Sequence, residues 1–208
     1  MSTEFSGSSG RTLGLPPSVW LRVESALQSL FELGAYRPGN AAMSLGLDAV
    51  ARRYAMSMLR GGLVLDVGCG DGFYAEQLER RGAEVVCLDP LERALRRSRT
   101  THAVVAVAEH LPFRGGSFDY AVAMFSVRDF LDKARGLFEM RRVARKGVII
   151  VDIFNPGDTL LRALFWAYVA AVAPLLGFLA SGEARRWLLL RHTLTFMPTA
   201  RLLERVGG

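Results

Sequence analysis

The sequence has little cysteine, little lysine and no pattern typical of an export signal. Of 208 residues only Cys69 and Cys87 are cysteines, too few for a disulfide framework, so a reducing cytoplasm is the expected location. Lys133 and Lys146 are the only lysines among 26 basic residues, which we interpret as a bias of genome composition. Residues 1–15 are polar and rich in Ser and Gly, without a basic segment followed by an apolar one. We expect a mobile tail there.

The sequence also lacks the residue clusters that bind metal ions or nucleic acids. No His/Cys cluster has the spacing of a zinc site, and no Ser/His/Asp arrangement can be identified, so no metal is predicted. The net charge of +6 is compatible with phosphate or an anionic membrane surface but requires neither. Seven arginines fall on predicted surface helices without interleaved aromatic residues, which indicates solvated faces and no nucleic-acid partner. They are Arg93, Arg96, Arg97, Arg99, Arg141, Arg142 and Arg145.

A single long uncharged run is present. Residues 163–180 contain no charged side chain, and as a helix they would span roughly 27 Å, close to the thickness of a bilayer core. Pro174, Gly177 and the many alanines argue against a membrane span. We therefore predict that residues 158–195 form a helical lid. It is either a buried hairpin that breaks near Pro174 or a segment that contacts lipid at the membrane periphery.

The spacing of apolar residues predicts two helices followed by alternating strands and helices. Periods of three and four residues indicate helices over 17–34 and 46–60. Short apolar runs then alternate with helical stretches, which predicts right-handed βαβ units and a parallel sheet in an α/β fold. The predicted strands are 63–65, 85–88, 102–107, 118–125 and 148–151, with helices at 73–81, 90–99 and 131–144. We predict one domain over 16–208, with N-terminal helices at 16–60 and a ligand-binding core at 61–153.

A glycine-rich loop follows the first predicted strand. Residues 66–72 read Asp-Val-Gly-Cys-Gly-Asp-Gly and run directly into a helix, and alternate glycines let the backbone turn sharply and approach a ligand closely. Asp89 ends the second strand, where a carboxylate can accept hydrogen bonds from both hydroxyls of a ribose. A dinucleotide and a cationic sulfonium ligand are the two candidates. The carboxylates of Asp66 and Asp71 would repel a pyrophosphate, so the sulfonium ligand is favoured.

Four motifs resemble those of one enzyme class. VLDVGCGDG at 64–72, CLDP at 87–90, AEHLPF at 108–113 and SFDYAV at 117–122 resemble the class I S-adenosylmethionine-dependent methyltransferases. The resemblance implies a Rossmann-like, doubly wound, mostly parallel sheet that binds S-adenosylmethionine and releases S-adenosylhomocysteine. Val107 stands where relatives commonly carry an Asp or Asn for adenine, so adenine recognition would rest on backbone groups near Ala108. The implied cofactor contacts are Asp66, Gly68, Cys69, Gly70, Gly72, Asp89, Pro90, Ala108, Glu109 and Met124.

The flanking residues narrow the resemblance. Tyr36, Asn40 and Ser44 keep a spacing of four, as in the Tyr-Asp-x-Met-Asn-x-x-Leu-Ser signature of the ubiquinone/menaquinone biosynthesis C-methyltransferases. Residues 125–129, Phe-Ser-Val-Arg-Asp, resemble that family's Phe-Gly-Leu-Arg-Asn. The chain departs from the family at Asp48, where the family has His. The resemblance implies a small lipophilic acceptor, such as the ring carbon of a prenylated quinol.

Methylation of a quinol ring carbon requires a base, because the pKa of an unperturbed phenol is about 10. We assign the base to Asp129 and stabilisation of the oxyanion to Arg128, with Tyr36 and Asn40 orienting the ring. The alternative is a local ion pair between Arg128 and Asp129, beside a Tyr36 that belongs to the core. His110 lies beside the expected cofactor edge and is expected to face solvent.

Two other functions remain open. One is a protein that binds S-adenosylmethionine without turnover; the other is a methyltransferase for a different small molecule or RNA, although Asn-Pro-Pro-Tyr-like and paired-cysteine signatures are lacking. Sheets of this class continue after strand five into a final antiparallel pair, which we expect this chain to lack. Strand five is then expected to be an edge, covered by residues 158–195 or by a second subunit of a homodimer.

Overall fold

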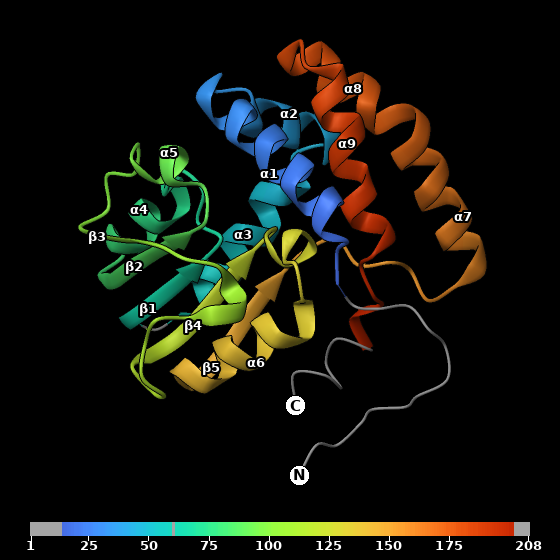
Figure 1. Ribbon diagram of the computed structural model, residues 1–208. Helices are drawn as coiled ribbons and strands as arrows, with labels where there is room; N and C mark the ends of the chain where they lie inside the picture. The colour runs from blue at the N-terminus through green and yellow to red at the C-terminus, as the bar shows by residue number, and fades with distance from the viewer. Residues whose placement is uncertain (1–13, 60, 202–208) are drawn as a thin grey trace.

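Five parallel strands form the centre of the molecule, in the order β3-β2-β1-β4-β5 (Figure 1). The structure, a computed structural model, describes residues 14–59 and 61–201. The sheet winds outward from β1 in both directions, which confirms the predicted Rossmann-like, doubly wound α/β fold. The strands are β1 (Gly62–Val67), β2 (Ala83–Asp89), β3 (His102–Val105), β4 (Phe118–Met124) and β5 (Ala144–Val151).

Helices occupy the predicted connections, and most are shorter than predicted. The stretch predicted as a helix over 90–99 holds only α5 (Glu92–Leu95). The helices before β5 are α1 (Pro17–Glu32), α2 (Tyr36–Met43), α3 (Leu47–Met58), α4 (Phe73–Glu79), α6 (Lys133–Val143) and the short η1 (Ala108–His110) and η2 (Val127–Asp129). After β5 come α7 (Thr159–Ala167), the π-helical turn η3 (Tyr168–Val172), α8 (Ala173–Ser181) and α9 (Ala184–Thr195).

The middle strands of the sheet, β1, β2 and β4, are covered on both faces, whereas β3 and β5 are more exposed. Along β1, Leu65 and Val67 join an apolar cluster with α6, whereas Val64 joins a second cluster with α3 and α4. This alternation follows from the two-residue period of a strand, whose successive side chains point to opposite faces. With both faces covered, the carboxyl ends of the strands form the edge at which ligands bind in open α/β sheets.

A third apolar cluster lies over this edge. Val23, Leu27 and Leu30 of α1 pack there with Trp187 of α9, and α1 crosses above the strand ends in Figure 1. A Cβ added at Gly39 of α2 would overlap the Trp187 ring, so glycine lets α2 lie directly against it. The helices therefore form a roof over the edge of the sheet.

Gly14, the first residue that the structure describes, forms an isolated antiparallel bridge with Asp132. The amide of Leu15 donates to the carbonyl of Leu131 at 2.8 Å, and the Leu15 side chain is buried. Gly14 and Leu15 therefore belong to the domain, which corrects the predicted boundary of the tail. Residues 1–13 lie outside the described residues, and mobility there stays a prediction.

Residues 158–195 contain a helical hairpin, but it does not break at Pro174 as predicted. One helix runs continuously from Thr159 to Ser181, and the chain reverses at Gly182, whose φ is 74°. A proline inside a helix lacks an N–H group and clashes with the carbonyl four residues earlier. Here the π-helical turn η3 precedes it, with the Ala173 amide bonded to the Tyr168 carbonyl, and the wider turn accommodates Pro174.

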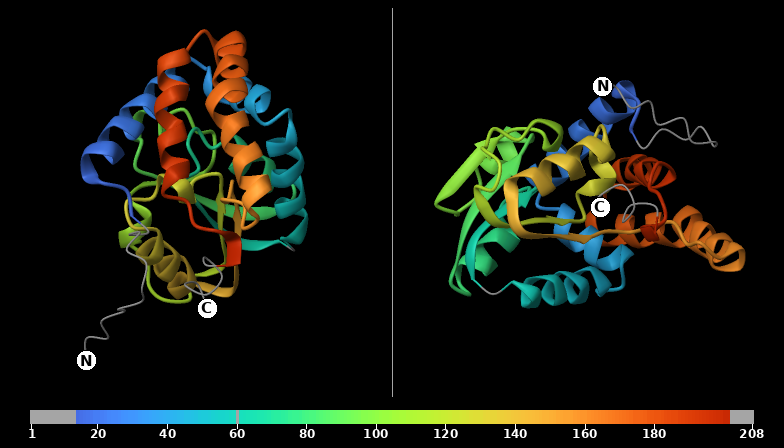
Figure 2. Two further views of the ribbon diagram at one scale, coloured as in Figure 1. Left: turned by 90° about the vertical axis from the view of Figure 1, so that its right-hand side faces the viewer. Right: turned by 90° about the horizontal axis from the view of Figure 1, so that it is seen from below.

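The hairpin packs on the roof helices, and α8 and α9 lie side by side in Figure 2. Its extensive contacts are between α8 and α2 and between α9 and α1, not with β5. The prediction that residues 158–195 cover strand five is therefore wrong. Among residues 14–59 and 61–201, no strand follows β5, which is an edge of the sheet. A second subunit at that edge stays a prediction.

Candidate functional site

The glycine loop between β1 and α4 has the left-handed backbone that only glycine adopts without strain. The φ angles of Gly68, Gly70 and Gly72 are 78°, 60° and 71°. A Cβ at Gly68 would overlap the Ser126 side chain, and one at Gly70 would approach the Phe31 ring to 2.5 Å. The loop thus needs glycine both for its conformation and for its close neighbours.

Asp89, at the end of β2, holds this loop in place. Its Oδ2 accepts a hydrogen bond from the Gly70 amide at 2.7 Å, and its Oδ1 accepts one from the Leu91 amide at 2.8 Å. Burial raises the pKa of Asp89 to about 6, against the lowering effect of these two hydrogen bonds. A carboxylate has about four acceptor positions, so each oxygen keeps one for a ligand.

Asp66 and Arg52 are two buried residues of opposite charge near the loop. Burial raises the pKa of Asp66 to about 7, although the nearby Arg52 charge lowers it. The Arg52 guanidinium lies between the rings of Tyr74 and Phe125, at 4.2 and 4.6 Å from their centroids, and donates to the Met124 carbonyl at 2.7 Å. Among the described residues its Nε has no hydrogen-bond partner.

A cavity of about 580 Å³, called the loop cavity below, opens between the glycine loop and α1. Four carboxylates line it: Glu24, Asp89, Glu109 and Asp129. Burial raises the pKa of Glu24 to about 8, and the other three charges add to this rise. The remaining lining residues are Trp20, Leu27, Phe31, Tyr36, Val67, Gly68, Gly70, Leu88, Pro90, Leu91, Val107, Ala108, Phe125, Ser126 and Phe130. The loop cavity therefore favours a cation.

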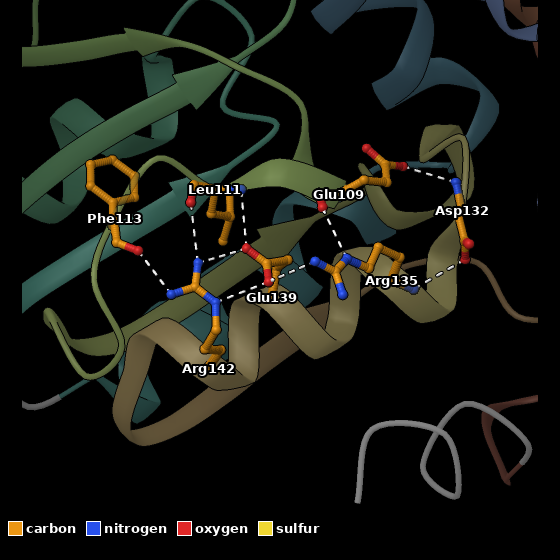
Figure 3. A network of polar contacts seen from close by, with 7 residues as sticks. All are labelled: Glu109, Leu111, Phe113, Asp132, Arg135, Glu139 and Arg142. Carbon is orange, nitrogen blue, oxygen red and sulfur yellow. Dashed lines mark hydrogen bonds and ion pairs between the residues drawn. The ribbon is translucent and has the colours of Figure 1, made fainter. Parts of the chain in front are cut away.

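A polar network fixes the wall of the loop cavity formed by η1 (Figure 3). Glu139 of α6 accepts a hydrogen bond from the Leu111 amide at 3.2 Å and pairs with Arg142 at 2.6 Å. Glu109 accepts one from the Asp132 amide at 2.9 Å. Arg142, predicted as part of a solvated face, is half-buried here and donates to the Phe113 carbonyl. Because η1 is only one turn long, these contacts with α6 hold it in position.

A second cavity of about 670 Å³, called the helix cavity below, lies under the hairpin. Most of its lining is apolar, and its polar side chains include Asn40, Arg128 and Arg191. Arg191 makes no ion pair or side-chain hydrogen bond with the described part of the chain. The other lining residues are Met43, Ser44, Phe125, Ile153, Phe165, Tyr168, Val169, Ala173, Pro174, Trp187 and Leu194. This cavity fits an apolar molecule that carries a few polar atoms.

Phe125 lines both cavities. It follows β4 with a φ of 64°, which is strained for a residue with a Cβ, and its amide donates to the Val151 carbonyl. A smaller cavity of about 320 Å³ beside the loop also touches Phe125, together with Arg37 and Arg52. Strained backbone of this kind often occurs at functional sites.

A cluster of buried charged residues lies beside Phe125, next to both cavities. Arg128 Nε lies 3.6 Å from Asp129 Oδ2, and Arg128 Nη1 lies 3.8 Å from Asp152 Oδ1. Burial alone would lower the pKa of Arg128, but Asp129, Tyr36 and Asp152 raise it. Burial raises the pKa of Asp129 to about 6, opposed by Arg128 and Lys133. Arg128 faces the helix cavity and Asp129 the loop cavity, so one ion pair contacts both.

The structure brings together most residues that the sequence predicted. Of the predicted cofactor contacts, six line the loop cavity: Gly68, Gly70, Asp89, Pro90, Ala108 and Glu109. Cys69 and Met124 line the smaller cavity. Asp66 and Gly72 line none of these cavities and lie behind the loop. Tyr36 and Asp129 face the loop cavity, Asn40 and Arg128 the helix cavity, and His110 is exposed as expected.

Tyr36 and Asn40 are also engaged in packing. The Tyr36 ring stacks on Phe31 at 4.4 Å between centroids. The Asn40 side-chain amide donates to Asp48 at 3.0 Å, which is the position where the chain departs from its relatives. The ion pair and the packed Tyr36 of the alternative interpretation are thus present, at positions that also border the cavities.

Three residues of the site were missed by the sequence analysis: Glu24, Arg52 and Phe125. Trp20, Glu24, Leu27 and Phe31 all line the loop cavity and recur at the helical spacing of one face, so a carboxylate inside an apolar stripe was the available signal. Arg52 lies inside a predicted helix without a motif. The positive φ of Phe125 has no signature in the sequence.

Comparisons with known proteins agree with this geometry. The family model for a methyltransferase domain matches residues 65–151. Demethylmenaquinone methyltransferase of Clavibacter sepedonicus is 32% identical over 182 residues, covering 82% of this chain and 74% of that protein. Ubiquinone/menaquinone biosynthesis C-methyltransferase UbiE of Geotalea uraniireducens is 29% identical over 181 residues, covering 74% of each.

Among solved structures, a Thermotoga maritima protein described as a SAM-dependent methyltransferase, possible histamine N-methyltransferase, has the same fold. The TM-score is 0.60 at 16% identity, covering 91% of this chain and 78% of that one. The fold, the glycine loop and the acidic strand ends define a class I S-adenosylmethionine-dependent methyltransferase. Within this class, the chain belongs to the family of the ubiquinone/menaquinone biosynthesis C-methyltransferases, which confirms the resemblance of its motifs.

Proposed function

We propose that the loop cavity binds S-adenosylmethionine and that the helix cavity binds a quinol with a lipophilic tail, which is methylated on a ring carbon. The observation that carries the proposal is the pair of adjoining cavities, one lined by carboxylates and one largely apolar, with Phe125 and the Arg128–Asp129 pair between them. The names of the relatives from Clavibacter and Geotalea support a quinone acceptor.

The charges around the loop cavity suit this cofactor. S-adenosylmethionine carries a sulfonium and an ammonium group, and both are cations that the carboxylates would attract. Asp89 would accept hydrogen bonds from the ribose hydroxyls, and Gly68 and Gly70 would let the backbone approach the methionyl part. Val107 and Ala108 would contact the adenine, and Glu109, Pro90, Cys69 and Met124 would complete the site, with Asp66 and Gly72 supporting the loop.

The carboxylate of the cofactor needs a cation of its own. Arg52 and Arg37 line the smaller cavity beside Gly70, and Arg52 has a buried Nε without a hydrogen-bond partner in the described chain. Arg37 already pairs with Asp71. We therefore assign the carboxylate to Arg52, whose unused donor would gain an acceptor there.

The chain's own residues supply the chemistry of the acceptor. When bound, the cofactor supplies an electrophilic methyl group. Arg128 would stabilise the ring oxyanion, and Tyr36 and Asn40 would orient the ring for in-line displacement. Asp129, whose Oδ1 has no hydrogen-bond partner among the described residues, would accept the proton of the ring hydroxyl. The new C–C bond replaces the S–CH₃ bond, whose electron pair stays on sulfur, and the ring C–H proton is released.

The first test is calorimetric titration with S-adenosylmethionine and S-adenosylhomocysteine. We expect binding of both, and a loss of affinity of about 100-fold in Asp89→Ala, because a charged group that holds the loop and the ribose is removed. Asp119→Ala is the matched control: Asp119 also accepts a backbone amide, that of Leu63, but at the opposite edge of the sheet. Absence of binding to the unsubstituted protein would refute the proposal.

The second test is a screen of reduced benzoquinols and naphthoquinols with and without prenyl tails. We expect C-methylation, with prenylated acceptors preferred because the helix cavity is largely apolar. Equal turnover of tail-free acceptors would contradict the lipophilic site. Cofactor binding without turnover of any acceptor would identify a non-catalytic binding protein. We also propose a cytoplasmic location, which the free Cys69 and Cys87 support.

A further inference from the structure

The helix from Thr159 to Ser181 is apolar on both of its faces. Its inner face, including Phe165, Val169 and Ala173, lines the helix cavity. Within residues 14–59 and 61–201 its outer face is largely uncovered, since only 11% of its most apolar 18-residue window is buried, at a mean hydropathy of 2.0. A helix that is hydrophobic all round is normally buried in a core or in lipid. The exposed large side chains include Leu160, Leu161, Leu164, Leu175, Phe178 and Leu179.

The charges of the hairpin are nearly all positive. Residues 159–195 contain four arginines, a single glutamate and no aspartate or lysine, so half of the chain's net charge of +6 lies in this segment. Arg162 is exposed in the first turn of the helix, and Arg185 is exposed just after the reversal at Gly182. The glutamate, Glu183, is already paired with Arg186. Arg162 and Arg185 form no ion pair with the described part of the chain, so a cation without such a partner stands at each end of the apolar face.

The apolar face and the arginines at its ends discriminate between two partners that could cover the helix, a second copy of the chain and a lipid bilayer. A second copy of the chain would bring like charges together at both ends of the contact, which is unfavourable. An anionic bilayer would accept the leucine and phenylalanine side chains among its acyl chains and attract the arginines to its head groups. The charge complementarity favours the bilayer.

We propose that the outer face of Thr159–Ser181 docks onto the surface of an anionic membrane, with the helix lying in the interface and the sheet in water. The face α7–α8, defined by these exposed residues, is the docking surface. The helix cavity then opens next to the lipid, and a tailed acceptor passes from the bilayer to the ring site around one helix. Only this last step rests on the proposed function; the docking itself does not.

Flotation of the full-length protein with vesicles tests the proposal. The probes are vesicles of phosphatidylcholine alone and of phosphatidylcholine with about a quarter phosphatidylglycerol. We expect the bound fraction to rise at least about tenfold with the anionic lipid and to fall again in high salt, because head-group attraction is screened. Equal failure to float with both compositions would overturn the proposal.

Two pairs of variants locate the surface. Leu164→Ser with Leu175→Ser is expected to abolish flotation, whereas the control Leu33→Ser with Val105→Ser, equally exposed but outside the helix Thr159–Ser181, keeps it. Arg162→Gln with Arg185→Gln is expected to remove the preference for anionic vesicles. Its control is Arg81→Gln with Arg114→Gln, two exposed arginines away from the hairpin. Controls that lose binding as much as the test variants would overturn the assignment of this face.

Sedimentation velocity on the same proteins tests the competing occupant. If the face joins two copies, the protein is a dimer that Leu164→Ser with Leu175→Ser dissociates, and vesicles do not bind; this result would overturn the proposal. Calorimetry with S-adenosylmethionine serves as the check on folding. Normal flotation without cofactor binding would refute the proposed function and leave the docking intact, and the reverse result would refute the docking alone.

Discussion

The loop cavity and the helix cavity share Phe125 but are built from different parts of the chain. The loop cavity uses the ends of β1, β2 and β4, four carboxylates and glycines that no other residue can replace. The helix cavity is formed mainly by α2 and by helices added after β5, and most of its lining is apolar. Under the proposed function, this difference means that the sheet edge selects the cofactor, whereas the added helices select the acceptor.

The largest effect is expected at Gly68, and it should affect only the loop cavity. Gly68→Ala places a Cβ against Ser126 at a φ of 78°, so the loop must move, and we expect the affinity for S-adenosylmethionine to fall about 100-fold in calorimetry. Gly46 has the same φ of 78° with nothing within 4 Å of a Cβ. Gly46→Ala therefore carries the same backbone strain without the overlap. Equal losses of affinity would mean that strain, and not contact with Ser126, dominates.

A smaller effect is expected at Ala173, and it should affect only the helix cavity. Ala173→Leu fills part of this cavity, so we expect the KM of a tailed acceptor to rise about tenfold while the affinity for S-adenosylmethionine stays within about twofold. Ala170→Leu is the control, since Ala170 is exposed on the same helix. A parallel loss of cofactor affinity would show that the two cavities are not independent.

The third prediction is a change in the stability of the protein at Glu24. Its pKa of about 8 in the folded protein exceeds its usual value of 4.5, so the stability that neutral Glu24 contributes is lost as pH rises from about 4.5 to 8. Glu24→Gln cannot ionise. The variant should melt at the same temperature as the unsubstituted protein near pH 4.5, and about 4–8 °C higher at pH 9, equivalent to ~2 kcal/mol.

Thermal melting of the ligand-free protein across this pH range measures the effect. Glu84→Gln, on an exposed strand residue, is the matched control and should show no such trend. A Glu24→Gln variant that gains nothing at pH 9 would indicate that the carboxylate is hydrated in the ligand-free cavity.

The two cavities also differ in how far the sequence predicts them. The strand ends and the glycine loop follow from local rules, because a loop that needs a positive φ and close approach admits only glycine. Asp89 was predicted in the same local manner, because it ends the second apolar strand. Glu24 was not, since a carboxylate inside the apolar stripe of α1 does not by itself reveal that α1 crosses the edge of the sheet.

The helix cavity depends still more on tertiary packing. The predicted break at Pro174 was wrong because the preceding turn widens and accommodates the missing N–H group. The chain reverses at Gly182, which has a left-handed backbone. In the sequence, this glycine was a better indication of the end of the helix than Pro174. The close packing of Gly39 and Gly177 against Trp187 joins three helices that are distant in sequence.

The wide turn η3 allows the helix cavity to change shape through the loss of a single residue. A π-helical turn contains one residue more than an α-helical turn, and one residue corresponds to a rotation of about 100°. Deletion of a single alanine there, Ala170 or Ala171, would therefore rotate α8 relative to α7 and bring Phe178 or Leu179 to a different side. The loss of one codon in this turn would thus change the shape of the helix cavity, while the sheet and the glycine loop keep their sequence.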